Sequence, residues 1–478
     1  MILVIDVGTT GLRASLVGPD GEVHDLRYKE SPPYSPAPMF VEFDPAAMAA
    51  AALELARSYD TATVDAVGVT NQRSSTVVWD RATGEPVGPG VSWQDVRTAG
   101  MCLALQARGI RLAPNESATK LAFLLDLADP GRERDLCFGT IETWIAWELS
   151  GGSLHVTDPG NAGVTGLLHL DGSGWNPEMC AALNVPDRVL PAIVDSSGVV
   201  GHASALPGAP PIAGLVGDQQ GSLLGQGCVA PGQAKITFGT GGMLDVCLGD
   251  ARPGFPRVGE AGTFPVIAWR VGGRITWGLE SVMMSAGQAV SWLKDDLELI
   301  ATPAESEAVA RRCDDSDGVV FVPALQGLGA PVWDFGARGT LLGLTRGAGR
   351  PQIVRAVLEG VAHRAVDLVE AAEADSGTSI ERLRVDGGMT ANSVFVQALA
   401  NAAQRPVEVS RVREATTLGA AFLAGLAVGV WSDLAECAAT WSPDAVVGPV
   451  RRADRAKWLD ARDRARGWIP ELTALEFF

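Results

Sequence analysis

The chain is poor in basic residues. Among its 478 residues, 38 lysines and arginines stand against 56 aspartates and glutamates, which gives a formal net charge of −18 and a pI of about 4.8. Such a surface repels phosphate backbones and anionic headgroups, so nucleic acid and membrane are excluded as expected partners. Low-complexity tracts are also absent, and 47% of the residues are hydrophobic, so a large core is available.

Paired cysteine motifs are missing as well. The seven cysteines are scattered through the chain without a CxxC pair, so neither a disulfide framework nor a zinc site is expected. The N-terminal run MILVIDVGTTG has no basic region and contains an acid, unlike a signal peptide. These absences predict a reduced, cytoplasmic chain.

No uncharged run is long enough for a typical membrane span. The longest, ATTLGAAFLAGLAVGVW at residues 415–431, is slightly short and rich in glycine and alanine. This composition predicts a buried helix that packs closely on a neighbour.

The familiar nucleotide motifs are absent: there is no GxxxxGK[ST] loop, and no GxGxxG opens a βαβ unit. Two similar glycine turns are present instead. Residues 2–17 and residues 234–249 each read as an apolar strand, a small-residue turn and a second apolar strand, which suggests an internal duplication. A third turn, Asp-Gly-Gly, lies between a strand near residue 385 and a helix expected from about Ala391.

Each turn alone could be a plain tight hairpin, but together they suit phosphate binding. Glycine lets backbone amides approach a ligand, and a helix N-terminus adds a partial positive charge. Strands alternate with helical stretches elsewhere, which favours an α/β fold, and the length favours two domains.

Asp218 is a lone carboxylate at the end of an apolar strand, in GDQQGSLLGQ. A carboxylate within reach of a sugar hydroxyl can accept its proton as general base, a contribution of about 10²–10⁴-fold. The alternative is an Asx turn or an N-cap of the following helix.

The whole chain resembles the FGGY family of carbohydrate kinases, and within it the members that phosphorylate glycerol. The signature GxLxGL, seven residues, then QIxxAVLE is met in full by Gly339 to Glu359. Other matching stretches are DVGTTGLR, GVTNQRSSTVVWDRATGEPV, GDQQGSLLGQ, TFGTGG, VDGGMTAN and EATTLGAAFLAGLAVG.

The resemblance implies two ribonuclease-H-like domains of the actin and hexokinase type, residues 1–226 and 227–478, with a catalytic cleft between them. It implies ATP-dependent phosphorylation of a primary hydroxyl of glycerol or a related small polyol or sugar, with Mg²⁺. The resemblance also assigns nucleotide-binding positions in both predicted domains: Thr9, Thr10, Gly11, Arg13, Thr240, Gly287, Gly388, Asn392 and Ser291, the last where a glutamine is usual.

The substrate side is assigned in the same way. Arg73, Trp93, Asp218 and Gln219 match or suit substrate contacts, and Asp6, with Asp218, matches the acids associated with magnesium. From the residues alone, Asp6 could be a turn acid, Arg73 a surface ion-pair partner and Trp93 a core residue.

Two substrate positions depart from the family pattern. Ser74 stands where a glutamate is usual, and Asn115 where a tyrosine is usual. These changes predict weaker glycerol binding and a preference for a four- or five-carbon polyol or ketose. A non-catalytic sugar or nucleotide sensor and an actin-like assembly protein are further alternatives. The oligomeric state stays open, a homodimer included.

Overall fold

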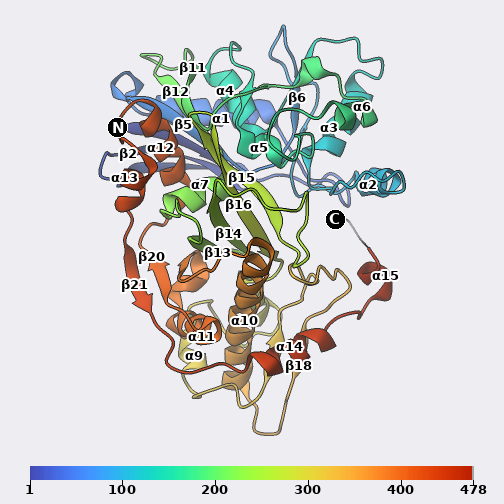
Figure 1. The fold of residues 1–478 in the computed structure, drawn as a ribbon, viewed down its shortest axis with the longest axis vertical. Helices are drawn as coiled ribbons and strands as arrows, with labels where there is room; N and C mark the ends of the chain where they lie inside the picture. The colour runs from blue at the N-terminus through green and yellow to red at the C-terminus, as the bar shows by residue number, and fades with distance from the viewer. Residues whose placement is uncertain (476–478) are drawn as a thin grey trace.

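The computed structural model describes residues 1–475. Its main sheet has thirteen strands that run through the whole molecule (Figure 1). In the first half of the chain the strands lie in the order β3 (Val23–Glu30), β2 (Gly11–Val17), β1 (Ile2–Val7), β5 (Ala66–Asn71), β12 (Pro211–Gly217) and β11 (Ser197–His202). In the second half the order is β15 (Phe264–Val271), β16 (Arg274–Met283), β14 (Gly242–Gly249), β13 (Ala234–Phe238), β19 (Leu383–Asp386), β20 (Val407–Ser410) and β21 (Pro443–Val447).

The two halves repeat one strand arrangement. β1 pairs antiparallel with β2, which pairs antiparallel with β3, while β5 and β12 follow parallel on the other side of β1. β13, β14, β16, β19 and β20 repeat this pattern. Both predicted hairpins are therefore confirmed, and the fold is the predicted mixed α/β architecture with two similar halves.

The halves meet at β11 and β15, which pair in parallel at Ser197 and Val271. Following the pairing directions across the sheet, β13 and β19 run the same way as β1, β5 and β12. The turns that follow β1 and β13 therefore lie at the same edge of the sheet, which is the edge where ligands bind in open α/β sheets.

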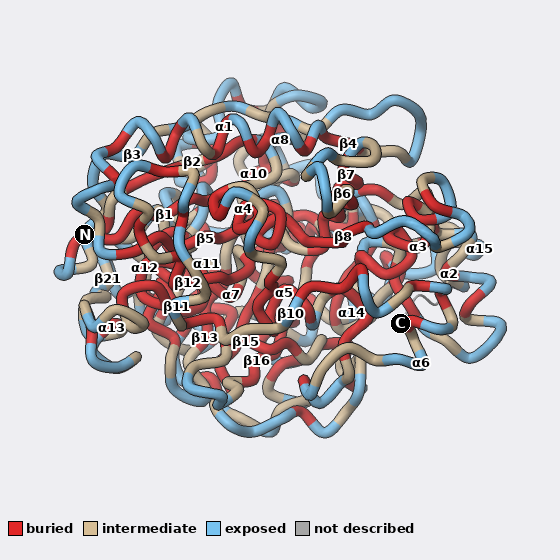
Figure 2. The backbone as a smooth tube through the Cα atoms, turned by 90° about the horizontal axis from the view of Figure 1, so that it is seen from above, coloured by how far each residue is buried: buried red, intermediate tan, exposed pale blue. Residues whose placement is uncertain are grey.

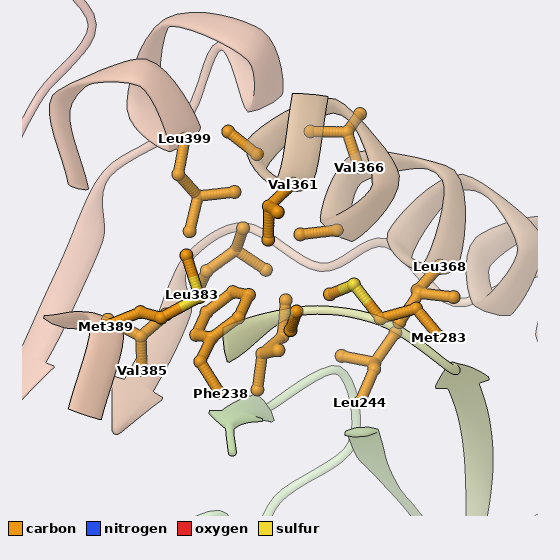
Figure 3. Close-up of a cluster of buried hydrophobic side chains, with 14 of the residues drawn as sticks. Phe238, Leu244, Met283, Val361, Val366, Leu368, Leu383, Val385, Met389 and Leu399 are labelled. Carbon is orange, nitrogen blue, oxygen red and sulfur yellow. The ribbon is translucent and has the colours of Figure 1, made fainter. Parts of the chain in front are cut away.

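Helices pack against the sheet in both halves. On the first half, α1 (Pro45–Arg57) and α4 (Ile141–Leu149) pack on one face, and α12 (Ala415–Ala427) packs on the other. In the second half, one apolar core is formed by the strands and three helices, α10 (Arg350–Ser376), α8 (Gly287–Asp295) and α11 (Ser393–Ala403). Figure 3 shows the resulting core, where Phe238, Leu244 and Met283 point at Val361, Leu368 and Leu399. Figure 2 shows the buried segments at the centre of the molecule and the exposed ones around them.

The remaining elements are shorter. Further strands are β4 (Glu42–Phe43), β6 (Val77–Asp80), β7 (Gly90–Val91), β8 (Leu136–Gly139), β9 (Val156–Thr157), β10 (Ala192–Ile193), β17 (Val320–Val322) and β18 (Thr340–Leu342). Further helices are α2 (Ala99–Gln106), α3 (Ser117–Ala128), α5 (Pro159–Gly163), α6 (Pro177–Ala182), α7 (Asp218–Gly225), α9 (Glu305–Ala310), α13 (Leu434–Ala439), α14 (Arg455–Arg464) and α15 (Pro470–Thr473), with 3₁₀ turns η1 (Thr61–Thr63), η2 (Asp187–Val189) and η3 (Gly388–Ala391).

The uncharged run at 415–431 forms α12 and is buried, as predicted. A Cβ built on Gly419 would lie 1.9 Å from the carbonyl oxygen of Gly221, so only glycine lets α12 and α7 approach this closely. Among residues 1–475, no helix has the length and apolarity needed to cross a membrane. Although α12 lies in the second half of the sequence, it packs on the sheet of the first half, and the predicted division at residue 226 stays a prediction.

A buried carboxyl group makes stability depend on pH. Glu142, on α4, is fully buried, and its Oε1 accepts hydrogen bonds from Thr140 (2.6 Å), Thr143 (3.0 Å) and Thr157 (2.6 Å), while its Oε2 has no hydrogen-bond partner among the described residues 1–475. Burial, with a smaller contribution from nearby Asp158, raises its pKa from 4.5 to about 7.

We expect the Glu142→Gln substitution to flatten the pH dependence of unfolding. Between pH 4.5 and 7 the folded state holds a proton that the unfolded state releases, so this contribution to stability is complete below pH 4.5 and lost above about pH 7. The shift corresponds to about 3 kcal/mol. Denaturant unfolding at pH 5 and pH 8 should therefore show a larger loss for wild type than for the variant. Parallel losses would contradict the assignment, and Glu133→Gln, at an exposed position, is the control.

Candidate active site

Three predicted site residues gather at the carboxyl ends of neighbouring parallel strands. Asp6 lies at the end of β1, Arg73 just after β5, and Asp218 just after β12. Val7 and Gly217 both pair with Asn71, so these strand ends are side by side. The Nε atom of Arg73 lies 3.3 Å from Oδ1 of Asp218, and Asp218 contributes to raising the pKa of Asp6. The sheet therefore brings the three side chains together.

Asp218 does not cap its helix. The N-cap residue of α7 is Gly217, which has no side chain that could cap the helix. Oδ1 of Asp218 instead accepts a hydrogen bond from the backbone N–H of Gln219, at 2.8 Å. Desolvation raises the pKa of Asp218, and the charge of Arg73 opposes the rise. A carboxylate with about a third of its side chain exposed remains available for a substrate proton.

Arg73 is a buried arginine that joins the two halves. Its second ion pair runs from NH2 to Oε2 of Glu280 on β16, at 2.7 Å, and both side chains are about one-tenth exposed. The surface ion pair considered from the sequence is therefore not what the structure shows. Arg73 holds Asp218 on one side and Glu280 on the other.

Ser74 and Asn115 lie in different surroundings. The hydroxyl of Ser117 donates to the carbonyl oxygen of Ser74 at 3.0 Å, while the Ser74 hydroxyl donates to the carbonyl of Val164 at 3.1 Å. Ser74 is buried, and its φ of 61° places it in the left-handed region. Asn115 is exposed. The Ser74 hydroxyl is thus already engaged within the protein, whereas the Asn115 side chain faces solvent.

Trp93 lies beside the first glycine turn. Its indole Nε1 donates to Oγ1 of Thr9 at 3.1 Å, and 39% of the residue is exposed. Trp93 is therefore not a core residue.

The first predicted phosphate loop is the turn between β1 and β2. Gly8 N–H bonds to the carbonyl of Gly11 at 3.0 Å, which closes a turn with Thr10 exposed at its tip. Arg13 pairs opposite Asp6 in the hairpin, with NH1 3.4 Å from Oδ2 of Asp6. Exposed backbone amides next to an arginine suit a phosphate ligand.

The second predicted loop is bound to the start of α8. The backbone N–H groups of Gly287 and Gln288 donate to the carbonyls of Gly239 (2.9 Å) and Thr240 (3.1 Å). Gly239 and Thr240 are exposed at the turn between β13 and β14, and Ser291 is exposed one turn further along α8. The structure thus brings Thr240, Gly287 and Ser291 together.

Gly388 and Asn392 follow the neighbouring strand. Thr237 pairs with Asp386, so the turn after β19 lies next to the turn after β13. Asn392 has a structural task, because its Oδ1 accepts from Phe395 N–H at 3.1 Å as the N-cap of α11, and its Nδ2 donates to Ser306 at 3.0 Å. Gly388 is exposed at this turn.

We expect Gly287→Ala to weaken ATP binding selectively. A Cβ at this position would lie 2.6 Å from the carbonyl oxygen of Gly239, so the glycine turn must shift. Overpacking of this kind costs about 1–3 kcal/mol, or about tenfold in affinity. Steady-state kinetics should show a higher KM for ATP and an unchanged KM for the acceptor substrate. Gly88→Ala, where a Cβ meets nothing within 4 Å, is the control; an unchanged KM for ATP would contradict the placement of this loop.

Asp6 is a buried carboxyl group whose negative charge a bound cation would stabilise. It is 4% exposed, and burial raises its pKa from 3.8 to about 7 despite Arg13 nearby. Within residues 1–475, no cluster of three or more His, Cys, Asp or Glu side chains could hold a metal alone. This small number of carboxylates fits Mg²⁺, which usually keeps several water ligands and is bound by one or two carboxylates together with substrate phosphates.

Four charged residues near the site were not predicted from the sequence: Lys235, Asp245, Glu280 and Glu414. Glu414 precedes α12, with Oε2 3.7 Å from Nε of Arg13. Lys235 and Asp245 form a buried ion pair at 2.7 Å. The only signal of Lys235, Asp245 and Glu280 in the sequence is a charged residue inside an otherwise apolar strand.

A cavity of about 330 Å³ lies elsewhere in the second half, near α10 and α14. Its lining includes Glu359, His363, Arg451 and Lys457, and it contains none of the predicted site residues. The predicted site residues lie instead at the sheet edge, where the loops after β1, β5, β12 and β13 meet.

The fold and the site define a two-domain kinase of the actin and hexokinase class. The chain belongs to the FGGY family of carbohydrate kinases: residues 1–225 match the N-terminal domain of that family and residues 234–428 its C-terminal domain.

Among curated relatives, the chain is similar to glycerol kinase from Aromatoleum aromaticum, with 42% identity over 98% of this chain and 99% of the relative. Glycerol kinase from Trichlorobacter lovleyi is also 42% identical, with the same shares of both chains covered. Among solved structures, Plasmodium falciparum glycerol kinase with ADP matches with a TM-score of 0.90 and 28% identity, over 100% of this chain and 99% of that one. The predicted family, fold class and kinase activity are confirmed.

Proposed function

We propose that the protein transfers the γ-phosphoryl group of ATP to a primary hydroxyl of glycerol, with Asp218 as the general base. Both curated relatives named above are glycerol kinases and align over nearly the full chain. The observation that supports the mechanism best is the placement of Asp218, which is partly exposed, directly follows the N-cap residue of α7, and is ion-paired with the largely buried Arg73.

In the proposed reaction, the hydroxyl oxygen attacks the γ-phosphorus while its proton passes to a carboxylate oxygen of Asp218. The bond between phosphorus and the bridging oxygen breaks, and ADP leaves. Arg73 orients Asp218 and donates to substrate hydroxyls, and Trp93 lies against the carbon chain. The glycine turns around Thr10 and Thr240 bind the phosphates, with Arg13 beside the first of them.

Mg²⁺ would neutralise phosphate charge at this site. Asp6 would hold it, largely through water, with Asp218 close by. We also propose the cytoplasm as the location, and the seven free cysteines support it, because disulfides are rare in that compartment.

A four- or five-carbon substrate is the second candidate, favoured by Ser74 and Asn115 in place of the usual glutamate and tyrosine. A carboxylate acceptor is worth about 1.5–3 kcal/mol against about 0.5–1.5 for a neutral one. However, the Ser74 hydroxyl is buried and already donates a hydrogen bond to the Val164 carbonyl, so it adds little to the binding of a longer substrate. The curated relatives also favour glycerol.

The test compares kcat/KM for glycerol with the values for four- and five-carbon polyols and ketoses, in wild type and in the double variant Ser74→Glu, Asn115→Tyr. We expect glycerol to be the preferred substrate, and the double variant to bind it about tenfold more tightly. A higher kcat/KM for a longer substrate would overturn glycerol as the substrate and leave the kinase assignment intact.

A further inference from the structure

A row of charged side chains crosses the sheet directly beneath α7. Lys235 on β13 pairs opposite Asp245 on β14, and Asp245 pairs opposite Glu280 on β16. Residues directly opposite on adjacent strands project from the same face of the sheet. Glu280 continues the row to Arg73, and Arg73 continues it to Asp218.

Lys235, at the other end of this row, contacts Gln219, the residue that follows the proposed base. Its Nζ atom lies 2.7 Å from Oδ2 of Asp245, 2.7 Å from Oε1 of Gln219 and 3.0 Å from Oγ1 of Thr237. The side chain of Lys235 is fully buried, and that of Asp245 is 3% exposed. Asp245 thus supplies the charge that offsets the burial of the ammonium group.

These contacts decide which way the Gln219 amide points. An ammonium group only donates hydrogen bonds, so the atom of Gln219 that faces Lys235 must be the oxygen. The Nε2 group donates no hydrogen bond to residues 1–475 in the structure, and Gln219 is partly exposed next to Asp218. An N–H donor is therefore left facing away from Lys235, beside the proposed base.

We propose that the buried pair Lys235–Asp245 fixes the Gln219 amide so that its nitrogen donates a hydrogen bond to a substrate oxygen next to the reacting hydroxyl. This inference rests on the proposed function. Lys235 and Asp245 are positioning residues, because they act through Gln219 and do not contact the substrate. The site consequently selects a substrate with an acceptor oxygen at this position.

The first test replaces the amide nitrogen without removing the contact to Lys235. In Gln219→Glu the carboxylate still accepts from Lys235, but it offers the substrate no donor. Calorimetry with glycerol should show affinity lowered about tenfold, while the affinity for ADP and the unfolding midpoint stay at wild-type values. Gln106→Glu, on α2 and outside the site, is the matched control. Wild-type glycerol affinity in Gln219→Glu would overturn the proposal.

The second test is a double-mutant cycle between the amide and the buried pair. Lys235→Met with Asp245→Leu removes both charges together, so neither is left buried alone. If the pair acts through Gln219, this variant raises the KM for glycerol about as much as Gln219→Ala, and combining all three changes adds no more. Effects that multiply, or an unchanged KM in the pair variant, would overturn the proposal.

The two failures are distinguishable. A wild-type protein that neither binds nor phosphorylates glycerol contradicts the proposed function itself. A wild-type protein that binds and phosphorylates glycerol, with a Gln219→Glu variant that binds it equally well, contradicts the inference about the Gln219 amide and leaves the proposed function intact.

Discussion

Asp218→Asn is expected to lower turnover by at least two orders of magnitude while ATP still binds. Asparagine keeps the size of the side chain and its hydrogen-bond acceptor, so the hydrogen bond from Gln219 N–H can remain. It cannot take a proton from the substrate hydroxyl, and a positioned base contributes about 10²–10⁴-fold to the rate. Because the interaction is made mainly in the transition state, kcat and kcat/KM should fall together.

The control for this substitution is Asp44→Asn. Asp44 is the N-cap of α1 and accepts from the backbone N–H of Ala47 at 3.0 Å, a task that asparagine performs equally well. Turnover in this control should equal that of wild type. Near-normal turnover in Asp218→Asn would rule out Asp218 as the general base.

Arg73→Met is expected to destabilise the protein by about 3–5 kcal/mol and to weaken acceptor binding. The change leaves Glu280 buried without its cation, and removing one partner of a buried pair has costs of that order. Unfolding in denaturant measures the first effect, and the KM for glycerol measures the second.

Adding Glu280→Leu to Arg73→Met separates the two effects. The double variant should recover most of the stability, because no charge is then left alone, but it should not recover glycerol binding, which needs the guanidinium group. Arg464→Met is the matched control, because its ion pair with Asp460 is exposed and such pairs contribute about 0.3–0.5 kcal/mol. Equal stability of Arg73→Met and Arg464→Met would contradict the role assigned to Arg73.

Much of the fold could be predicted because it is encoded locally. The hairpins at 2–17 and 234–249 carry apolar strands on both sides of small-residue turns, and both form as predicted. The helix expected from about Ala391 begins at Ser393, after a 3₁₀ turn. The closely packed helix predicted within 415–431 is α12.

The long-range features could not be predicted. Within the main sheet the two halves pair at Ser197 with Val271, and no local pattern encodes this pairing. The packing of α12 on the sheet of the other half depends on where the strand glycines Gly68 and Gly214 meet the α12 backbone in space. Both features arise from tertiary contact between distant segments.

Some residues of the candidate site could be predicted from local sequence, and others could not. Asp6, Arg73 and Asp218 lie at or just after strand ends, next to glycine or polar turns, so their residue type and position made them candidates from the sequence. Lys235 and Asp245 sit inside strands, where a single polar residue usually indicates an exposed face. Only the register of β13, β14 and β16 shows that these charges form one buried row below Gln219.

The most direct measurement of the central claim is glycerol-dependent ADP formation by the wild-type protein with ATP and Mg²⁺, beside Asp218→Asn under the same conditions. We expect ADP formation that requires glycerol, with one glycerol phosphate produced for each ADP and almost no product from the variant. ADP formation that is independent of glycerol and of every polyol or ketose offered, or a variant as active as wild type, would contradict it.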